Sequence, residues 1–245
     1  MSRNFELLAQ VEELLGASAP EVPTDVIVRE QPRVTAAPIA DLEGVGKQEM
    51  LRLVQQVFLS ANGSAPRQVV FCGVNDGKGS SVICARTGRV LAAQTSRPVC
   101  IVDANHHSQT ARGLFEAGSN AFGVAPGSSA REQCQKIAEN LWLAPAAVLG
   151  TDNGSSVSDL RARLEALRRE FDYVLVDAPP AALHSHTAVL GQAADGIVLV
   201  LEANATRRIA AKKTKEALEA GSVRLLGTVL NNRTFPVPEK LYRRL

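Results

Sequence analysis

Continuous apolar runs alternate with helix-like segments along most of this sequence, and this alternation constrains the fold more than any other feature. The runs are QVVFCGV, PVCIVDA, DYVLVDAPP, GIVLVLE and VRLLGTVLN, at residues 68–74, 98–104, 172–180, 196–202 and 223–231. Uninterrupted apolar strands are typical of a parallel sheet that helices cover on both faces. The sequence therefore predicts an α/β fold, a doubly wound, mostly parallel sheet with helices on both faces.

Helices are predicted wherever apolar residues recur at helical spacing. The predicted ranges are 2–16, 47–60, 81–95, 108–116, 129–139, 156–170, 186–193 and 206–220. Four of the twelve prolines fall within residues 17–45, which predicts a linker. We therefore expect two parts: an N-terminal helix with a proline-containing linker at 1–45, and the α/β domain at 46–245.

Composition excludes several classes of protein. Aromatic residues make up only 4% of the chain, which argues against a stacking platform for single-stranded nucleic acid. No apolar run reaches the ~18 residues that a membrane helix needs, and no signal-peptide pattern opens the chain. We therefore expect a cytoplasmic protein that binds no nucleic acid and does not insert directly into a membrane.

Cysteines and histidines offer an alternative chemistry. No CxxC pair occurs, so the spacing favours buried, reduced thiols over a disulfide frame or a metal site. The cysteines are Cys72, Cys84, Cys100 and Cys134. Four histidines follow predicted strand ends, where they could form a transition-metal site, although solvent-facing side chains are the more common outcome. They are His106, His107, His184 and His186.

A glycine-rich loop, GVNDGKGSS, follows the first predicted strand and precedes a helix. Such a loop holds phosphate with backbone N–H groups and the helix dipole, but the consensus GxxxxGK[ST] is not met in either register. With Gly77 and Lys78 as the GK pair, Gly79 stands at the hydroxyl position. With Gly79 as the last loop glycine, Ser81 supplies the hydroxyl and Ser80 replaces the lysine. We favour the second register, because Ser81 then begins the helix with a hydroxyl suited to Mg²⁺.

Two predicted strands end in carboxylates. Asp103 ends the second strand, and Asp177 ends DYVLVDAPP, as the metal-facing aspartate of a Walker B strand does. Ligands of such sheets bind at the carboxyl ends of the strands. Carboxylates beside a glycine loop can hold Mg²⁺ and orient a hydroxyl group or water. The order of these elements therefore predicts descent from a nucleotide-binding protein.

These motifs resemble those of the bacterial tyrosine autokinases (BY-kinases), which regulate exopolysaccharide and capsule synthesis and are relatives of the MinD/ParA ATPases. CGVNDGKGSS takes the place of the Walker A motif, CIVDANHH that of Walker A′ and VLVDAPP that of Walker B. The later segments DGIVLVLEANATRR and LLGTVLNNR also match, so the resemblance spans nearly the whole chain.

The resemblance implies a P-loop NTPase-like fold, with Mg-ATP or Mg-ADP as the only cofactor. It implies nucleotide binding by Gly77, Lys78, Gly79, Ser80, Ser81 and Asn231. It implies Mg²⁺ binding by Ser81, Asp103 and Asp177. If the protein is active, catalysis would involve Asp103, Asp177 and Lys78.

Departures from the family pattern cluster where its chemistry occurs. Charged residues of the family pattern are replaced at Ser80, Asn105, His107, His186 and Gln55. Near the C-terminus one tyrosine, Tyr242, stands where the family carries a tyrosine cluster. We therefore expect a degenerate member with weak nucleotide binding and weak or no ATP turnover. It would regulate polysaccharide polymerisation or export through the cytoplasmic segment of a membrane co-polymerase, which would recruit it to the inner face of the membrane.

Three readings remain beside this one. The first is an active tyrosine autokinase or ATPase that uses Lys78 with Asp103 and Asp177 on the metal. The second is a positioning ATPase of the ParA/MinD type, against which the absence of a KGGxGK loop argues. The third is a redox or metal-binding role. In the family's ExxRxxR assembly motif Glu49 and Arg52 remain, but Gln55 replaces the last arginine, so we expect a monomer or dimer when the protein is alone.

Overall fold

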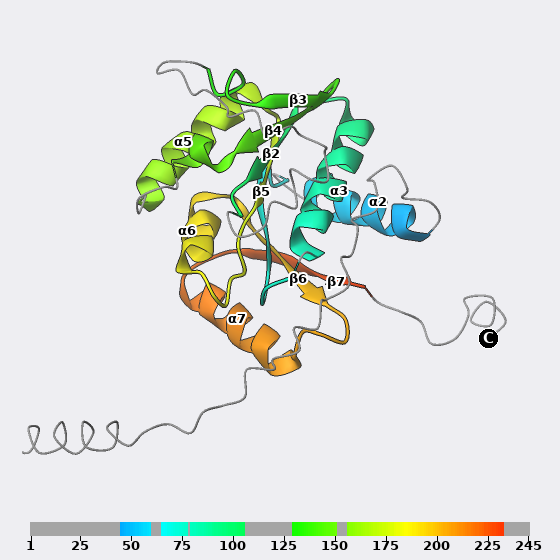
Figure 1. The fold of residues 1–245 in the computed structure, drawn as a ribbon, viewed down its shortest axis with the longest axis vertical. Coiled ribbons are helices and arrows are strands. Elements are labelled where there is room, and N and C mark those ends of the chain that lie inside the picture. Colours follow the sequence, from blue (N-terminus) through cyan, green and yellow to red (C-terminus); the bar gives the residue numbers. More distant parts are fainter. Residues whose placement is uncertain (1–44, 60–64, 78, 106–128, 151–155, 233–245) are drawn as a thin grey trace, which may run out of the picture. The chain divides into compact units, whose positions relative to one another are not determined.

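The structure is a computed structural model that describes residues 45–59, 65–77, 79–105, 129–150 and 156–232. These residues lie within one compact unit, Ala36–Leu245. They form a seven-stranded sheet in the order β3-β4-β2-β5-β1-β6-β7 (Figure 1). The helices expected at 2–16 and 108–116, and the part expected at 1–45, lie almost wholly outside the described residues.

The strands confirm the predicted sheet. All neighbouring strands run parallel except β3 and β4. The strands are β1 (Gln68–Gly73), β2 (Val99–Asp103), β3 (Gln135–Ala138), β4 (Leu141–Pro145), β5 (Tyr173–Asp177), β6 (Gly196–Glu202) and β7 (Leu225–Asn231). Every residue of β1, β2 and β5 is buried, as expected for central strands with apolar residues on both faces.

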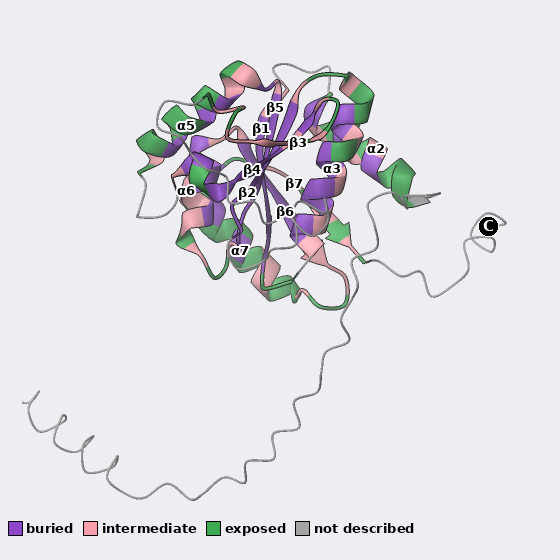
Figure 2. Cartoon of the chain, turned by 45° about the horizontal axis from the view of Figure 1, so that its top comes forward, coloured by how far each residue is buried: buried purple, intermediate pink, exposed green. Residues whose placement is uncertain are grey.

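Helices cover the two faces of the sheet (Figures 1 and 2). Two pack on one face, and the short 3₁₀ helix Ala146–Leu149 and three further helices pack on the other, so the sheet separates two apolar cores. The helices are α2 (Val45–Phe58), α3 (Gly79–Thr95), α5 (Val157–Glu170), α6 (Ser185–Ala193) and α7 (Arg208–Ala220). Among the described helices, none combines the length and the apolar character that crossing a bilayer requires.

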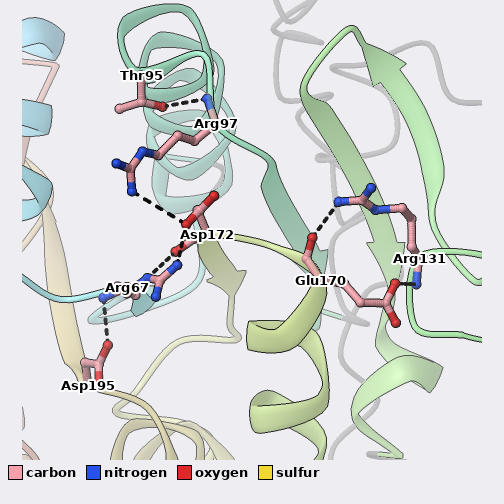
Figure 3. A network of polar contacts seen from close by, with 7 residues as sticks. All are labelled: Arg67, Thr95, Arg97, Arg131, Glu170, Asp172 and Asp195. Atoms are coloured by element: carbon pink, nitrogen blue, oxygen red, sulfur yellow. Dashed lines mark hydrogen bonds and ion pairs between the residues drawn. The ribbon is translucent and has the colours of Figure 1, made fainter.

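The helix predicted at 129–139 is wrong. A turn occupies the first half of this segment and strand β3 the second. The Glu170 carboxylate accepts the backbone N–H groups of Ala130 at 2.9 Å and Arg131 at 2.8 Å. The Arg131 guanidinium lies 4.7 Å from the centre of the Trp142 ring, and Figure 3 shows its contacts with Glu170. These tertiary contacts override the local helical pattern.

Charged side chains hold together the amino ends of the central strands (Figure 3). Asp195, just before β6, accepts the backbone N–H groups of Arg67 and Gln68 at 2.7 and 2.8 Å. The Arg67 side chain donates to the backbone and carboxylate oxygens of Asp172, just before β5. Neighbouring parallel strands are thereby tied at one edge of the sheet, and the loops that bear the predicted site residues leave from the opposite edge.

Candidate functional site

Asp103 and Asp177 are brought side by side. They end the neighbouring strands β2 and β5 and are paired in register. Asp177 is also in register with Phe71 of β1, two residues before the end of that strand. Both aspartates are buried. The glycine loop that follows β1 therefore starts beside the carboxylate pair, as the order of motifs predicted.

Helix α3 begins at the loop and carries both serines inward. Ser81 is fully buried and lies beside the Asp177 carboxylate. Ser80 is also buried, and its Oγ lies 3.8 Å from the position that a Cβ on Gly73 would take, so it faces the base of the loop. The two neighbouring hydroxyls therefore face different groups: Ser81 lies beside Asp177, and Ser80 faces Gly73. Lys78 lies outside the described residues.

The Asp177 carboxyl is strongly perturbed. Burial raises its pKa from 3.8 to about 8, the Ser81 hydroxyl partly offsets this effect, and the Asp103 carboxylate raises it further. The geometry between Ser81 and Asp177 falls short of a regular hydrogen bond, so the Asp177 oxygens and the Ser81 Oγ have none within the described part of the chain. A buried acceptor in this state is costly unless a cation or a proton satisfies it.

These oxygen donors fit Mg²⁺. The ion prefers carboxylate and hydroxyl oxygens and usually retains several waters, so one or two carboxylates suffice. Ser81, Asp177 and Asp103 would hold it, and the bound ion would supply positive charge for a phosphate in the glycine loop. Proton and metal would then be alternative ways to satisfy Asp177.

Asn231 ends β7, an edge strand of the sheet, and its side chain reaches the loop. A Cβ on Gly79 would lie only 2.8 Å from the Asn231 Nδ2, so the asparagine side chain lies across the first residue of α3. A side chain at position 79 would have to displace the Asn231 amide from this place. The structure therefore places Asn231, to which the resemblance assigns nucleotide binding, beside the loop, although the two are separated by most of the domain in sequence.

The remaining predicted residues are less informative. Asn105 is buried, and its Oδ1 has no hydrogen bond within the described residues. His184 precedes α6 and His186 lies in its first turn, whereas His106 and His107 lie outside the described residues. Over the described ranges, no three His, Cys, Asp or Glu side chains gather in a way that could hold a metal ion.

The cysteines are free, as predicted. Burial raises the pKa of the Cys72 thiol to about 12, and the nearby Asp177 carboxylate adds to the rise. Burial likewise raises the pKa of Cys84 well above its usual value. A thiol that stays protonated is a poor nucleophile and a poor metal ligand, so these residues belong to the core.

One residue beside the loop was missed from the sequence. Glu202 ends β6, and its Oε2 lies 3.4 Å from the position of a Cβ on Gly77. The signal that identified Asp103 and Asp177, a carboxylate at the end of an apolar strand, was present here as well. The ends of β2 and β5 on one side of β1, and of β6 and β7 on the other, therefore surround the loop with one amide and three carboxylate side chains.

No family model matches the chain, but it is similar in sequence to known proteins. Tyrosine-protein kinase CpsD of Streptococcus agalactiae is 25% identical over 177 residues, which cover 69% of this chain and 77% of that protein. Tyrosine-protein kinase YwqD of Bacillus subtilis is 28% identical over 174 residues, which cover 68% of this chain and 73% of that protein. Both alignments span most of the α/β domain.

Solved structures share the fold. The chimerical protein CapA2B2 has a TM-score of 0.66 at 22% identity and covers 93% of this chain and 99% of its own. The kinase domain of the Escherichia coli tyrosine kinase ETK has a TM-score of 0.63 at 18% identity, covering 78% and 79%. MinD of Aquifex aeolicus, in its complex with MinC, has a TM-score of 0.56 at 18% identity, covering 73% and 72%. The chain is thus similar in sequence to proteins named bacterial tyrosine-protein kinases, and it shares its fold with a tyrosine kinase domain and with MinD.

Proposed function

We propose that this chain is a degenerate BY-kinase-like protein that regulates exopolysaccharide or capsule polymerisation or export, with weak nucleotide binding and weak or no ATP turnover. Its relatives CpsD and YwqD are named tyrosine-protein kinases, which supports the family context. The regulatory role and the proposed partner, a cytoplasmic segment of a membrane polysaccharide co-polymerase, rest on the family resemblance. Through that partner the protein would work at the inner face of the membrane.

The observation that carries the proposal is Ser80. A P-loop lysine at this position would place a full positive charge where phosphate charge develops, but the Ser80 side chain is neutral, buried and turned towards Gly73. Loss of one preorganised charged group costs ~10²–10³ in rate. Its loss from the ground state removes a charged contact worth about 1.5–3 kcal/mol. Backbone and Mg²⁺ contacts can therefore retain weak binding while turnover falls to background.

The alternative is an active tyrosine autokinase or ATPase that uses Lys78. The side-by-side arrangement of Asp103, Asp177 and Ser81 supports this alternative, because these are the side chains to which the resemblance assigns the metal. Lys78 would have to supply, from two positions upstream, the charge that Ser80 lacks. Measurements of nucleotide binding and of ATP turnover distinguish the degenerate protein from the active enzyme.

Titration calorimetry with ATP and ADP, with and without Mg²⁺, tests binding directly. We expect weak or undetectable binding by the wild type and background autophosphorylation. In Ser80→Lys we expect Mg-ATP affinity to rise by about tenfold or more, whereas the neutral control Ser80→Gln should leave it unchanged. Micromolar Mg-ATP binding by the wild type, or ATP hydrolysis that Lys78→Ala abolishes, would establish the active alternative instead.

A further inference from the structure

Hydrogen bonds at the end of β6 hold Glu202 beside the glycine loop. Its backbone N–H donates to the Thr206 Oγ1 at 2.8 Å, and its Oε1 accepts the Asn232 Nδ2 at 3.0 Å. The other carboxylate oxygen, Oε2, faces Gly77. The Thr206 hydroxyl therefore fixes the backbone of Glu202, and the neutral Asn232 amide holds one carboxylate oxygen while the other is directed at the loop.

Glu202 lies on the same face of the sheet as α3. Val198 and Val200, at alternate positions before it in β6, pack in the core on the α3 side, and side chains alternate between faces along a strand. In register, Glu202 pairs with Asn231, whose amide lies across Gly79. Glu202 and Asn231 therefore approach two neighbouring glycines of the loop from the same pair of strand ends.

Among the described residues, the charged side chains at the carboxyl ends of these strands are mostly negative. Asp103 and Asp177 lie on one side of the loop, and Glu202 lies on the other. Arg208 borders, together with Glu202, an open hollow of about 480 Å³ between β6, β7 and α7, but no ion pair joins the two side chains in the described part of the chain. The hydrogen bond to Glu202 Oε1 comes from the uncharged amide of Asn232.

We propose that Glu202 is a selectivity determinant of the glycine loop, which disfavours the terminal phosphates of a nucleotide. This inference deepens the proposed function and rests on it. The loop's backbone N–H groups attract phosphate, whereas a carboxylate held beside Gly77 repels it, and this repulsion grows with the phosphate charge nearby. Glu202 thus adds to the loss of the lysine at position 80 in weakening polyphosphate binding.

Glu202→Gln tests the inference, because the amide oxygen of glutamine can still accept from Asn232 while the charge is removed. We expect the affinity for Mg-ATP to rise about tenfold, that for Mg-ADP to rise less and that for AMP to stay unchanged. This gradient with phosphate number is a readout that a merely structural role would not produce. Calorimetry or equilibrium dialysis measures it in the wild-type background and in the Ser80→Lys background, where binding is stronger.

Two matched variants serve as controls. Glu216→Gln on α7 changes the net charge equally at an exposed site, where the carboxylate pairs with Lys212 of the same helix, so it should leave all three affinities unchanged. Glu202→Asp keeps the charge and should retain weak binding. Equal gains for Glu216→Gln and Glu202→Gln, a gain independent of phosphate number, or no gain in either background would overturn the inference. Tight Mg-ATP binding by the wild type would instead contradict the proposed weak binding, and the ratio between Glu202→Gln and wild type would still decide the role of Glu202.

Discussion

Asp177 shows how a single buried carboxyl links the stability of the domain to its site. It is completely buried between β1 and β2, its pKa is raised to about 8, and its main cause of perturbation is burial. At neutral pH without metal the folded protein therefore keeps this group largely protonated. A bound Mg²⁺ would reverse the preference, because a metal ligand must be deprotonated.

The first prediction concerns the pH dependence of unfolding. In the unfolded chain Asp177 ionises near 3.8, and in the folded chain near 8, so between these values the folded state holds one proton more. Stability due to this group is full below about pH 4 and is lost as the pH rises towards about 8. Asp177→Asn should therefore remove this loss, a difference of about 2–5 kcal/mol between the two ends of the window.

Denaturant unfolding of metal-free protein at about pH 5 and about pH 8 measures this difference. Asp76→Asn, which alters an exposed carboxylate of the loop, is the control and should keep the wild-type slope. Added Mg²⁺ should stabilise the wild type more at the higher pH and should not stabilise Asp177→Asn. Identical pH slopes in wild type and Asp177→Asn would show that Asp177 is ionised in the folded protein.

At the residue scale the sequence is informative where a side chain has one local role. Ser81, Asp103 and Asp177 could be predicted, because a helix start and two strand ends fix them at one edge of a parallel sheet. The approach of Glu202 to Gly77 depends on strand β6 lying next to β1. The strand-end position of Glu202 in the sequence indicates the same end of the sheet, but the pairing of β6 with β1, which brings the carboxylate to Gly77, follows from tertiary packing.

At the scale of elements, α3 is the part that positions the site. It joins the loop at one end and packs closely on the sheet through Gly88, where a Cβ would lie 2.5 Å from the Ile101 Cδ1. Ile101 is fully buried in β2, two residues before Asp103. The spacing between α3 and β2 therefore sets how Ser81 and Asp103 approach each other.

The second prediction concerns the substitution Gly88→Ala in α3. The added methyl group must displace Ile101 or tilt α3, and such overpacking typically costs about 1–3 kcal/mol, more than the gain in helix propensity from replacing glycine. Gly227→Ala in β7 is the matched control, because a Cβ there meets nothing within 4 Å. Chemical denaturation compares them, and equal stabilities would show that α3 can shift without cost.

Most elements could be predicted from the sequence because their periodicity is strong. The strands match the apolar runs to within a few residues, and α5 begins with a capping box between Ser156 and Asp159 that marks its start. The segment 129–139 could not be predicted, because β3 is a half-exposed edge strand whose pairing with β4 and whose anchor to Glu170 are tertiary. Short edge strands lack the apolar pattern on which the other assignments rest.

At the scale of the whole molecule, helix α2 is the element that bears on assembly. Its buried side, with Met50, Val54 and Phe58, packs in the core on the α3 face. Glu49, Arg52 and Gln55 are exposed, and the Arg52 Nη1 lies 2.9 Å from the Glu49 Oε1. An exposed pair of this kind contributes little and is easily exchanged, so Arg52 remains able to meet a partner.

The final prediction is that the protein alone is a monomer or dimer rather than a closed ring. The family resemblance implies assembly through the arginines of an ExxRxxR helix, and Gln55 cannot supply the second guanidinium, with its charge and its planar pair of donors. Light scattering at tens of micromolar should therefore give a small species. Gln55→Arg should shift it towards larger assemblies, whereas Gln55→Lys, which restores charge without the fork, should shift it less. A stable wild-type species of about eight chains, each of 26.1 kDa, would show that ring closure needs only Arg52 and the rest of the interface.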